Sequence, residues 1–489
     1  MENNSYKETK EKAVSGLLWS FLERFGAQGV TFVVSIVLAR LLDPEVYGTV
    51  AIVTVVMEIL NVFIDSGLGN ALIQKKDADD LDFSSVFYFN LLICLGSYAI
   101  VCAAAPLVAG YFDIPILTPL IRVMGLTLVI SGVKNIQRAY VARQMCFKRF
   151  FFATLGGTIS AAALGIWMAL RGYGVWALVA QALLNNLIDT IILWITVKWR
   201  PKRMFSFARF RGLFSFGWKL LLSSLINTVY NNLRQLVIGK MYTTSSLAFY
   251  NRGYMLPNVI VSNINSAVDT VLLPAMSSAQ EDIAVVRQMT RRSVQLSAFV
   301  MWPAMMGLAA CAQPLVLLLL TDKWLPCVPF VVMFCVSYAF MPSQTASLNA
   351  IKAVGCSDVY LRLEIIKKIV SFAILFATMW FGPLVMAASN ILCAVICQLI
   401  GAPSVKKLLG YTYRQQLEDI MPPMLLSAVM FAVVYAVSFT GMADWLMLLV
   451  QIPLGVVLYC GGAKLLKMES LDYTVLMLKK LLGRGGDPD

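Results

Sequence analysis

Long runs of apolar residues, separated by short polar or charged segments, dominate the hydropathy pattern of this chain. Each run has about 20 or more residues, enough for a helix to cross the roughly 30 Å hydrocarbon core of a bilayer. The fourteen predicted spans are 14–40, 46–73, 83–110, 117–142, 150–171, 174–197, 212–240, 246–276, 293–320, 326–351, 359–381, 384–405, 420–440 and 444–465. The short alternating segments of a membrane β-barrel are absent from this pattern. We therefore expect an all-α polytopic membrane protein.

The composition agrees with this expectation. Of the 489 residues, 59% are hydrophobic and 14% are charged, whereas soluble domains carry about 25% charged residues. Residues 1–13 are polar, and the apolar run that follows is too long for the core of a cleavable signal peptide. That run also lacks a small-residue cleavage site, so we expect it to remain as the first helix.

The positions of the basic residues predict the orientation of these helices. In a fourteen-helix plan, most of the 40 lysine and arginine residues share a side with the N-terminus, and the strongest cluster is KWRPKRMFSFARFR at 198–211. The opposite loops hold Arg40, Arg171, Lys240 and Lys323. Because basic loops stay in the cytoplasm, we expect both termini to be cytoplasmic. The net charge of +13 then reflects topology, and no nucleic-acid partner is needed to explain it.

Two halves of six predicted spans lie on either side of the basic cluster. RGYGVWALVAQALLNNLID (171–189) resembles MWFGPLVMAASNILCAVIC (379–397), and LARLLDPEVYG (38–48) resembles IGKMYTTSSLAFY (238–250) at a similar offset. Six helices preserve direction, so the halves would be parallel repeats about an axis along the membrane normal. The alternative is that any two apolar helices look alike. The predicted organisation is a cytoplasmic segment at 1–13, an N-lobe at 14–200, a cytoplasmic linker at 201–211, a C-lobe at 212–408, two additional helices at 409–465 and a cytoplasmic tail at 466–489.

Few residues in the chain indicate catalytic or metal chemistry. The sequence has no histidine and no Walker-type phosphate loop. Its ten cysteines are scattered, and Cys393 and Cys397 share a helix face without further ligands. The acidic segment KKDADDLD at 75–82 lacks the spacing of a calcium loop and indicates a solvated turn. We expect no catalytic site, no metal and no cofactor.

Polar side chains recur at helical spacing along one face of several predicted spans. The first span carries Ser20, Arg24, Gln28, Thr31 and Ser35; the seventh carries Lys219, Ser223, Asn227, Tyr230, Asn231 and Arg234; the eighth carries Arg252, Asn263, Ser266 and Asp269. Ionisable groups inside a membrane usually face a bundle interior or a water-filled cavity. We therefore interpret Arg24, Lys219, Arg234 and Arg252 as candidates for lining a hydrated cavity. The alternative is that such polar groups join neighbouring helices by hydrogen bonds.

A cavity lined by these cations would suit an anion. Arginine forks and lysine ammonium groups bind phosphate oxygens, so a diphosphate is a fitting ligand. Glu58, Asp65 and Asp269 are candidates for charge balance or for binding a coupling ion. Tyr230, Tyr250 and Tyr254 lie along the same path and could stack on sugar rings.

Several motifs resemble those of a known family. GLLWSFLERFGAQGVTFVVSIVLARLLDPEVYGTVAIV (16–53), DSGLGNALIQKKD (65–77) and YNRGYMLPN (250–258) resemble bacterial polysaccharide flippases of the Wzx type. The turn LARLLDPEVYG is the most specific of these matches. The superfamily also contains multidrug extruders and the peptidoglycan-precursor flippase. Arg24 falls on the first helix, where that flippase carries a functional arginine, so the resemblance implies the same role here.

The resemblance implies two six-helix lobes that alternate in access across the bacterial cytoplasmic membrane. The implied substrate is an undecaprenyl-diphosphate-linked oligosaccharide, moved among membrane lipids with the help of an ion gradient. A polysaccharide polymerase and export machinery would be partners. A multidrug cation antiporter of the same fold is the alternative, although basic residues outnumber acidic ones within the spans. An integral glycosyltransferase or polymerase would need larger loops than this chain has.

Overall fold

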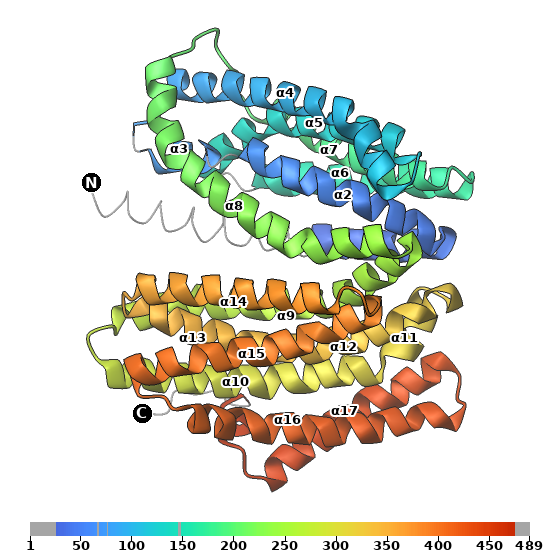
Figure 1. Ribbon diagram of the computed structural model, residues 1–489, viewed down its shortest axis with the longest axis vertical. Helices are drawn as coiled ribbons and strands as arrows, with labels where there is room; N and C mark the ends of the chain where they lie inside the picture. The colour runs from blue at the N-terminus through green and yellow to red at the C-terminus, as the bar shows by residue number, and fades with distance from the viewer. Residues whose placement is uncertain (1–25, 66–67, 76, 145–147, 475–489) are drawn as a thin grey trace. The chain divides into compact units, whose positions relative to one another are not determined.

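The computed structural model describes residues 26–474, apart from 66–67, 76 and 145–147 (Figure 1). A helix covers Gly26–Leu41. The helices that follow are α2 (Pro44–Asp65), α3 (Leu68–Gln74), α4 (Asp80–Phe112), α5 (Leu117–Arg143), α6 (Lys148–Leu170), α7 (Val175–Thr196), α8 (Phe207–Met241), α9 (Thr244–Ser278), α10 (Ile283–Ala310), α11 (Ala312–Leu319), η1 (Asp322–Cys327), α12 (Val328–Ala339), α13 (Met341–Ala353), α14 (Ser357–Thr378), α15 (Pro383–Leu409), α16 (Tyr413–Ala436), η2 (Val437–Thr440) and α17 (Asp444–Leu465). Within these described ranges the chain forms helices and turns and no strand.

Eleven helical segments of the described chain are long and apolar enough to cross a membrane. The prediction of an all-α polytopic membrane protein is therefore confirmed. Three further predicted spans also contain helices that are not among the eleven, namely Gly26–Leu41, Phe207–Met241 and Ser357–Thr378. The total of fourteen crossings stays a prediction.

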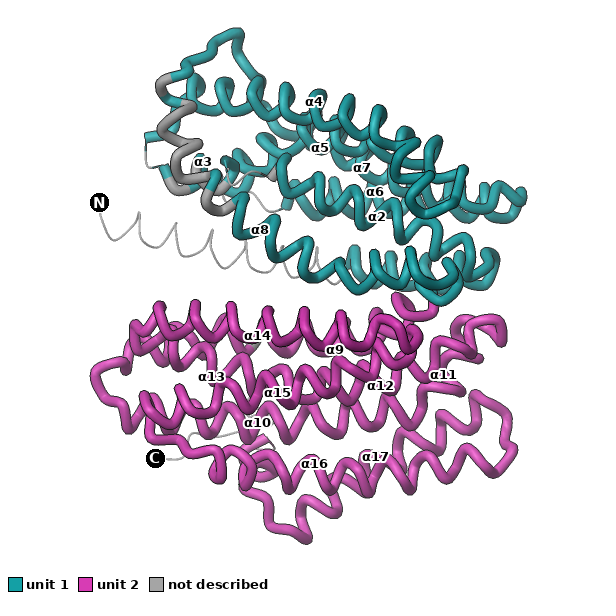
Figure 2. Tube along the Cα trace, viewed as in Figure 1, with its two compact units in different colours: residues 1–248 teal, residues 249–489 magenta. Residues whose placement is uncertain are grey.

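The chain divides into two compact units, residues 1–248 and residues 249–489, which are described separately (Figure 2). Helix α8 belongs to the first unit, and the division falls inside α9. The predicted lobe boundaries at 200 and 212 follow from sequence repeats and remain a prediction.

Unit 1 is built from closely packed helix pairs. Helix α4 packs along α5, α6 packs along α7, and α5 also contacts α7 and α2. A core of aromatic and aliphatic side chains lies among α3, α4, α5 and α7 and ends at Trp199, whose ring stacks on Tyr140 at a centroid distance of 6.1 Å. A second core joins the helix at Gly26–Leu41 to α6 and α7. In lipid, such close packing replaces the hydrophobic effect as the force that holds helices together.

Unit 2 is organised around α10, α12 and α15. Helix α10 packs against α16, α13 and α12, while α15 packs against α12 and α14. Helix α17 contacts α16 and α11. Helix α14 also packs against α15 and α13. A small pocket, described below, lies where these helices meet α16.

Gly48 of α2 marks a very close approach between backbone segments of unit 1. A Cβ atom at this position would lie 1.8 Å from the carbonyl oxygen of Thr244, the first residue of α9. Any other side chain would force the two helix starts apart, so glycine is required here.

Candidate functional site

Two of the four predicted anion-binding cations lie where the structure gives no side chain to describe. Arg24 lies outside the described residues. Lys219 lies in α8, but its side chain is among those outside the described part. Arg234 is half-buried on the same helix. The predicted grouping of these cations stays a prediction.

The polar stripe on α8 is exposed at Ser223, Asn227 and Asn231. Asn232, which lies off the stripe, is buried, and so is Ile238, which continues the stripe beyond Arg234. On the helix at Gly26–Leu41, Gln28 and Thr31 are exposed, Ser35 is half-buried, and Val34 and Leu38 are buried in a core. Both polar stripes of unit 1 are therefore accessible.

Glu58 of α2 makes a hydrogen bond that the sequence did not indicate. Asn232 Nδ2 of α8 donates to Glu58 Oε2 at 2.9 Å, and Gln235 Nε2 donates to Asn232 Oδ1 at 3.1 Å. The carboxylate thus joins α2 to α8 within one turn of Arg234. Asp65 ends α2, but its side chain is outside the described part of the structure.

Arg252 is buried in the wall of unit 2. Only 8% of the residue is exposed, and its guanidinium carbon lies 5.3 Å from the ring centroid of the fully buried Trp324. Arg252 Nη1 also donates to Met255 Sδ at 3.4 Å. The guanidinium therefore lies against an aromatic ring, in a cation–π contact that also fixes η1 against α9.

Two tyrosines near Arg252 differ in their surroundings. Tyr250 is buried, with its ring 5.1 Å from Phe334 and 6.1 Å from Phe330 of α12. It is part of a packed core, so the hypothesis that its ring is free to stack on a sugar was wrong. Tyr254 is exposed and lies beside Phe334 at 5.6 Å, so its outer surface remains accessible.

Asp269 of α9 is exposed and accepts a hydrogen bond from a buried amide of α13. Asn349 Nδ2, in a residue with 1% exposure, donates to Asp269 Oδ1 at 2.7 Å. The contact joins α9 to α13 within unit 2. It resembles the Glu58 contact of unit 1, because in each unit an exposed carboxylate binds the amide of a neighbouring helix.

An ion pair inside unit 1 joins α5 to α7. Lys134 Nζ donates to Asp189 Oδ2 at 2.9 Å and to Asn186 Oδ1 at 3.0 Å, and both charged residues are 8% exposed. The sequence showed both ionisable residues within spans but not their pairing. Because 55 residues separate them, periodicity within one helix could not reveal this contact.

The acidic segment before α4 binds the α7–α8 connection (residues 197–206). Asp80 accepts from Trp199 Nε1 at 3.1 Å and from Lys202 Nζ at 2.6 Å, and Asp79 pairs with Arg209 at 2.6 Å. Asp82 is fully buried and pairs with Lys75 at 2.5 Å. We name these residues the α4 cluster. The prediction of a solvated turn at 75–82 holds for the exposed Asp77 and Asp79 but was wrong for Asp82, which is buried. The partners of Asp79 and Asp80 lie more than 100 positions away in the sequence.

Backbone hydrogen bonds fix the same connection. The Lys202 N–H donates to Ser84 Oγ at 3.0 Å, and the Ser206 N–H donates to Ser85 Oγ at 2.9 Å. The backbone N–H of Asp82 and then the Arg209 guanidinium hold the pKa of Asp79 at about 2, below its ordinary 3.8. The connection is therefore a firmly attached part of unit 1.

Asp419 of α16 is the acceptor at the centre of a second charged group, the Asp419 cluster. Arg291 of α10 binds it through two hydrogen bonds of 2.8 and 3.0 Å, and Gln295 Nε2 donates at 2.7 Å. Tyr411, in the turn between α15 and α16, donates its hydroxyl at 2.8 Å. Burial and the neighbouring carboxylate raise the pKa of Tyr411 well above its ordinary value. The cluster ties α16 to α10.

The described residues contain no group of three or more histidine, cysteine, aspartate or glutamate side chains placed to hold a metal ion. The carboxylate–amide contacts and the Lys134–Asp189 ion pair join neighbouring helices within each unit.

Two solved structures share the fold of this chain. A structure titled lipid II flippase MurJ, inward closed conformation, aligns with a TM-score of 0.73 and 16% identity, covering 92% of this chain and 98% of that one. A multidrug resistance MATE family transporter in an inward-facing conformation aligns with a TM-score of 0.60 and 15% identity, covering 80% and 98%. The chain therefore has the fold of this transporter superfamily.

Sequence comparison identifies the family. The protein-family model described as polysaccharide biosynthesis protein matches residues 37–329 of this chain. The chain therefore belongs to this family. It is 27% identical to the succinoglycan biosynthesis transport protein ExoT of Rhizobium meliloti over 69% of this chain and 68% of the relative. It is 24% identical to the lipopolysaccharide biosynthesis protein WzxC of Escherichia coli over 88% of each chain. The resemblance stated from the sequence is thus confirmed: the protein is a transmembrane transporter of polysaccharide biosynthesis, not an enzyme.

Proposed function

We propose that the protein is a flippase for an undecaprenyl-diphosphate-linked oligosaccharide. It would carry this unit from the inner to the outer leaflet of the bacterial cytoplasmic membrane by alternating access of two six-helix lobes. The transporter family, the MurJ-like fold and the names of the relatives support this proposal.

The accessible polar stripe of α8 is the observation that carries the proposal. Ser223, Asn227 and Asn231 are exposed along a helix that is otherwise rich in apolar residues. Exposing these polar side chains to hydrocarbon would cost free energy, whereas exposing them to a water-filled substrate path would not. Arg234 lies one turn beyond Asn231, where its guanidinium would suit a diphosphate oxygen.

The other predicted cations complete the proposed anion path. Arg24 and Lys219 belong to it by their positions on the polar stripes of their helices. Arg252 would contact an anion after its guanidinium leaves the Trp324 ring. Glu58 and Asp269, each bound to an asparagine amide, would balance these charges or bind a coupling ion, and Asp65 is a third acidic candidate.

The proposed topology places both termini in the cytoplasm. The N-lobe at 14–200 and the C-lobe at 212–408 would be joined by the cytoplasmic linker at 201–211, with two additional helices at 409–465. Reporter fusions after residue 208 and after residue 489 should both be active only in the cytoplasm. A polysaccharide polymerase and export machinery would act on the oligosaccharide after it reaches the outer leaflet.

Deletion of the gene tests the proposed function. Lipid-linked oligosaccharide should accumulate on the cytoplasmic side, as measured by its protection from an externally added glycosidase, and the wild-type gene should restore exposure. Arg234→Ala should abolish this rescue, Arg234→Lys should rescue partly, and Lys240→Ala, which alters the external end of the same helix, should rescue fully. Unchanged glycan exposure in the deletion strain would refute the proposal. Altered drug susceptibility with unchanged glycan would favour the multidrug antiporter instead.

A further inference from the structure

The inward stripe of α14 contains one charged residue. Leu363, Ser371 and Leu375 are 3–5% exposed, and Lys367 occupies the position between Leu363 and Ser371 at the same four-residue spacing. Lys367 therefore stands on the face that α14 turns toward α15 and α13. It is the eleventh residue of the 22-residue helix Ser357–Thr378, near its middle.

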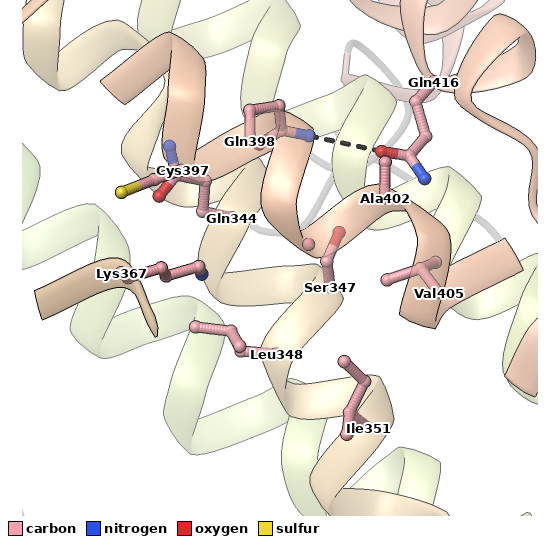
Figure 3. A pocket seen from close by; sticks show the side chains of 11 residues that line it. Gln344, Ser347, Leu348, Ile351, Lys367, Cys397, Gln398, Ala402, Val405 and Gln416 are labelled. Carbon is pink, nitrogen blue, oxygen red and sulfur yellow. Dashed lines mark hydrogen bonds between the residues drawn. The ribbon is translucent and has the colours of Figure 1, made fainter. Parts of the chain in front are cut away.

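A small pocket lies at the end of this lysine. Its polar lining comes from Gln344 and Ser347 of α13, Lys367 of α14, Gln398 of α15 and Gln416 of α16. Figure 3 shows the nitrogen end of Lys367 directed into the space between these side chains. The cavity volume of about 10 Å³ has room for about one water molecule.

The hydrogen bonds around the pocket leave acceptors facing it. Gln398 Nε2 donates to Gln416 Oε1 at 3.3 Å (Figure 3), and Ser347 Oγ donates to the Ser343 carbonyl at 3.1 Å. Gln398 Oε1 is buried without a hydrogen-bond partner in the structure. The pocket thus offers acceptor oxygens and one ammonium donor. A water molecule matches this set, because it can accept from Lys367 and donate to Gln398.

Lys367 is partly buried, and it differs from the buried Lys134 in having no ion pair within 4.0 Å among the described residues. Glu364, one turn earlier on α14, and Cys397 of α15 are the titratable groups that face it. Gln344, Ser347 and Gln416 face it from α13 and α16 and do not titrate. The remaining titratable groups nearby have other contacts: Lys352 lies over the Tyr360 ring, Cys393 contacts Ser371, and Asp269 accepts from Asn349.

We propose that this pocket is a proton-binding site, in which Lys367 exchanges one proton with a single bound water. On release, one N–H bond of the ammonium breaks, the proton passes to the water and then to solvent, and a neutral amine remains. No electron is transferred. An ammonium without a directly paired carboxylate is costly within a membrane, so release allows α14 to pack more closely on α13 and α15. The exchange couples a proton gradient to transport, and this inference rests on the proposed flippase function.

Reconstitution of the full-length protein tests the inference. The probe is undecaprenyl-diphosphate-linked oligosaccharide in vesicles of phosphatidylethanolamine and phosphatidylglycerol, and the readout is the fraction exposed to an external glycosidase. With one proton exchanged per substrate, a gradient of one pH unit is worth about tenfold in the ratio between leaflets. Wild-type protein should show this response, as should Lys368→Met, which alters the neighbouring residue off the stripe.

The Lys367 variants should lose the response to the gradient. Lys367→Met should equilibrate the lipid between leaflets without a gradient but fail to accumulate it with one. Lys367→Arg should also fail to accumulate lipid, because the guanidinium stays charged and cannot release a proton. If Lys367→Met does not fold, Lys367→Gln replaces it as the neutral variant. Gradient-driven accumulation that persists in any folded variant would overturn the inference alone. The inference alone would also be overturned if the wild-type protein equilibrates lipid between leaflets but a pH gradient does not change the leaflet ratio. A wild-type protein that moves no lipid would overturn the proposed function and the inference with it.

Discussion

The α4 cluster of unit 1 and the Asp419 cluster of unit 2 both hold a connection that leads into a long helix, but their charges are reversed. In unit 1 the acids Asp79 and Asp80 stand at the start of α4, and the bases Lys202 and Arg209 lie on or next to the connection. In unit 2 the base Arg291 stands on α10, and the acid Asp419 lies on α16, the helix that follows the connection. The same attachment is thus made with opposite polarity.

The two clusters also differ in their access to solvent. In the α4 cluster the side chains of Asp79 and Arg209 are 50% and 41% exposed and only Asp82 is fully buried. In the Asp419 cluster the central acid is 4% exposed and its partner Arg291 is 45% exposed. Exposed ion pairs contribute little because water and salt screen them. Removing one partner of a buried pair leaves an uncompensated charge and costs far more. We therefore expect the buried acids Asp419 and Asp82 to dominate stability and the exposed Asp79–Arg209 pair to be sensitive to solution conditions.

Loss of the Asp419 carboxylate should have the largest effect. Asp419→Ala removes the acceptor for Arg291, Gln295 and the buried Tyr411 and should lower stability by about 2–4 kcal/mol, because the half-exposed Arg291 can regain water. Thermal unfolding of the purified protein in detergent measures this loss. Glu418→Ala is the matched control, because Glu418 is exposed and pairs with the exposed Arg414 in the preceding turn. Equal effects of the two substitutions would contradict the distinction between buried and exposed charges.

Asp82→Asn should rank second. Asp82 is the fully buried member of the α4 cluster, and its pairing with Lys75 and its contact with the Asp79 N–H would weaken. We expect a loss of about 1–3 kcal/mol in the same unfolding assay. Asp77→Asn, five positions earlier at an exposed site, should be neutral. If Asp82→Asn leaves the stability unchanged, burial of the acid does not determine how much each substitution destabilises the protein.

Arg209→Gln should have a smaller effect that depends on salt. The pair with Asp79 is exposed, so added salt screens it in the wild-type protein. The difference in unfolding temperature between wild type and variant should therefore shrink as ionic strength rises. Asp419→Ala should keep its difference at high salt. A salt-independent Arg209→Gln effect would remove this contrast between the clusters.

Asp79→Asn should change the acid sensitivity of unfolding and little else. The folded pKa of Asp79 is about 2 and its ordinary value is 3.8, so the ionised carboxylate stabilises the fold above about pH 3.8. That contribution decreases as the pH falls from 3.8 toward 2. The unfolding temperature of wild type should fall more steeply than that of the variant across this window. Parallel curves would show that Arg209 and the Asp82 N–H do not hold the carboxylate.

Hydropathy carried most of the fold prediction because span length and apolar content are local properties of the sequence. The α8 stripe was also visible, since Ser223, Asn227 and Asn231 recur at helical spacing and prove to be exposed together. Which residues meet between helices was not visible. Glu58 and Asn232 are 174 positions apart, and only packing of α2 on α8 brings them together.

The same limit explains the predictions that were wrong. The contacts of Asp79 and Asp80 were not visible at 75–82 because their partners Arg209, Trp199 and Lys202 follow more than 100 residues later. Tyr250 shares its segment with the accessible Tyr254, but only the packing of α9 on α12 shows that Tyr250 is enclosed by aromatic rings. Helix periodicity gives a direction for each side chain, but it does not give the neighbour found in that direction.

The anchored connection between α7 and α8 offers a place for a spectroscopic label. Met204 is exposed, and the backbone on either side of it is tied to Ser84 and Ser85 of α4. A dye at Met204→Cys would therefore follow unit 1 as a rigid body and would not report local loop motion. Among the cysteines that the structure describes, only Cys460 of α17 is exposed, so a second dye can be placed on unit 2 without altering its sequence. The two dyes would make the distance between the units measurable during turnover.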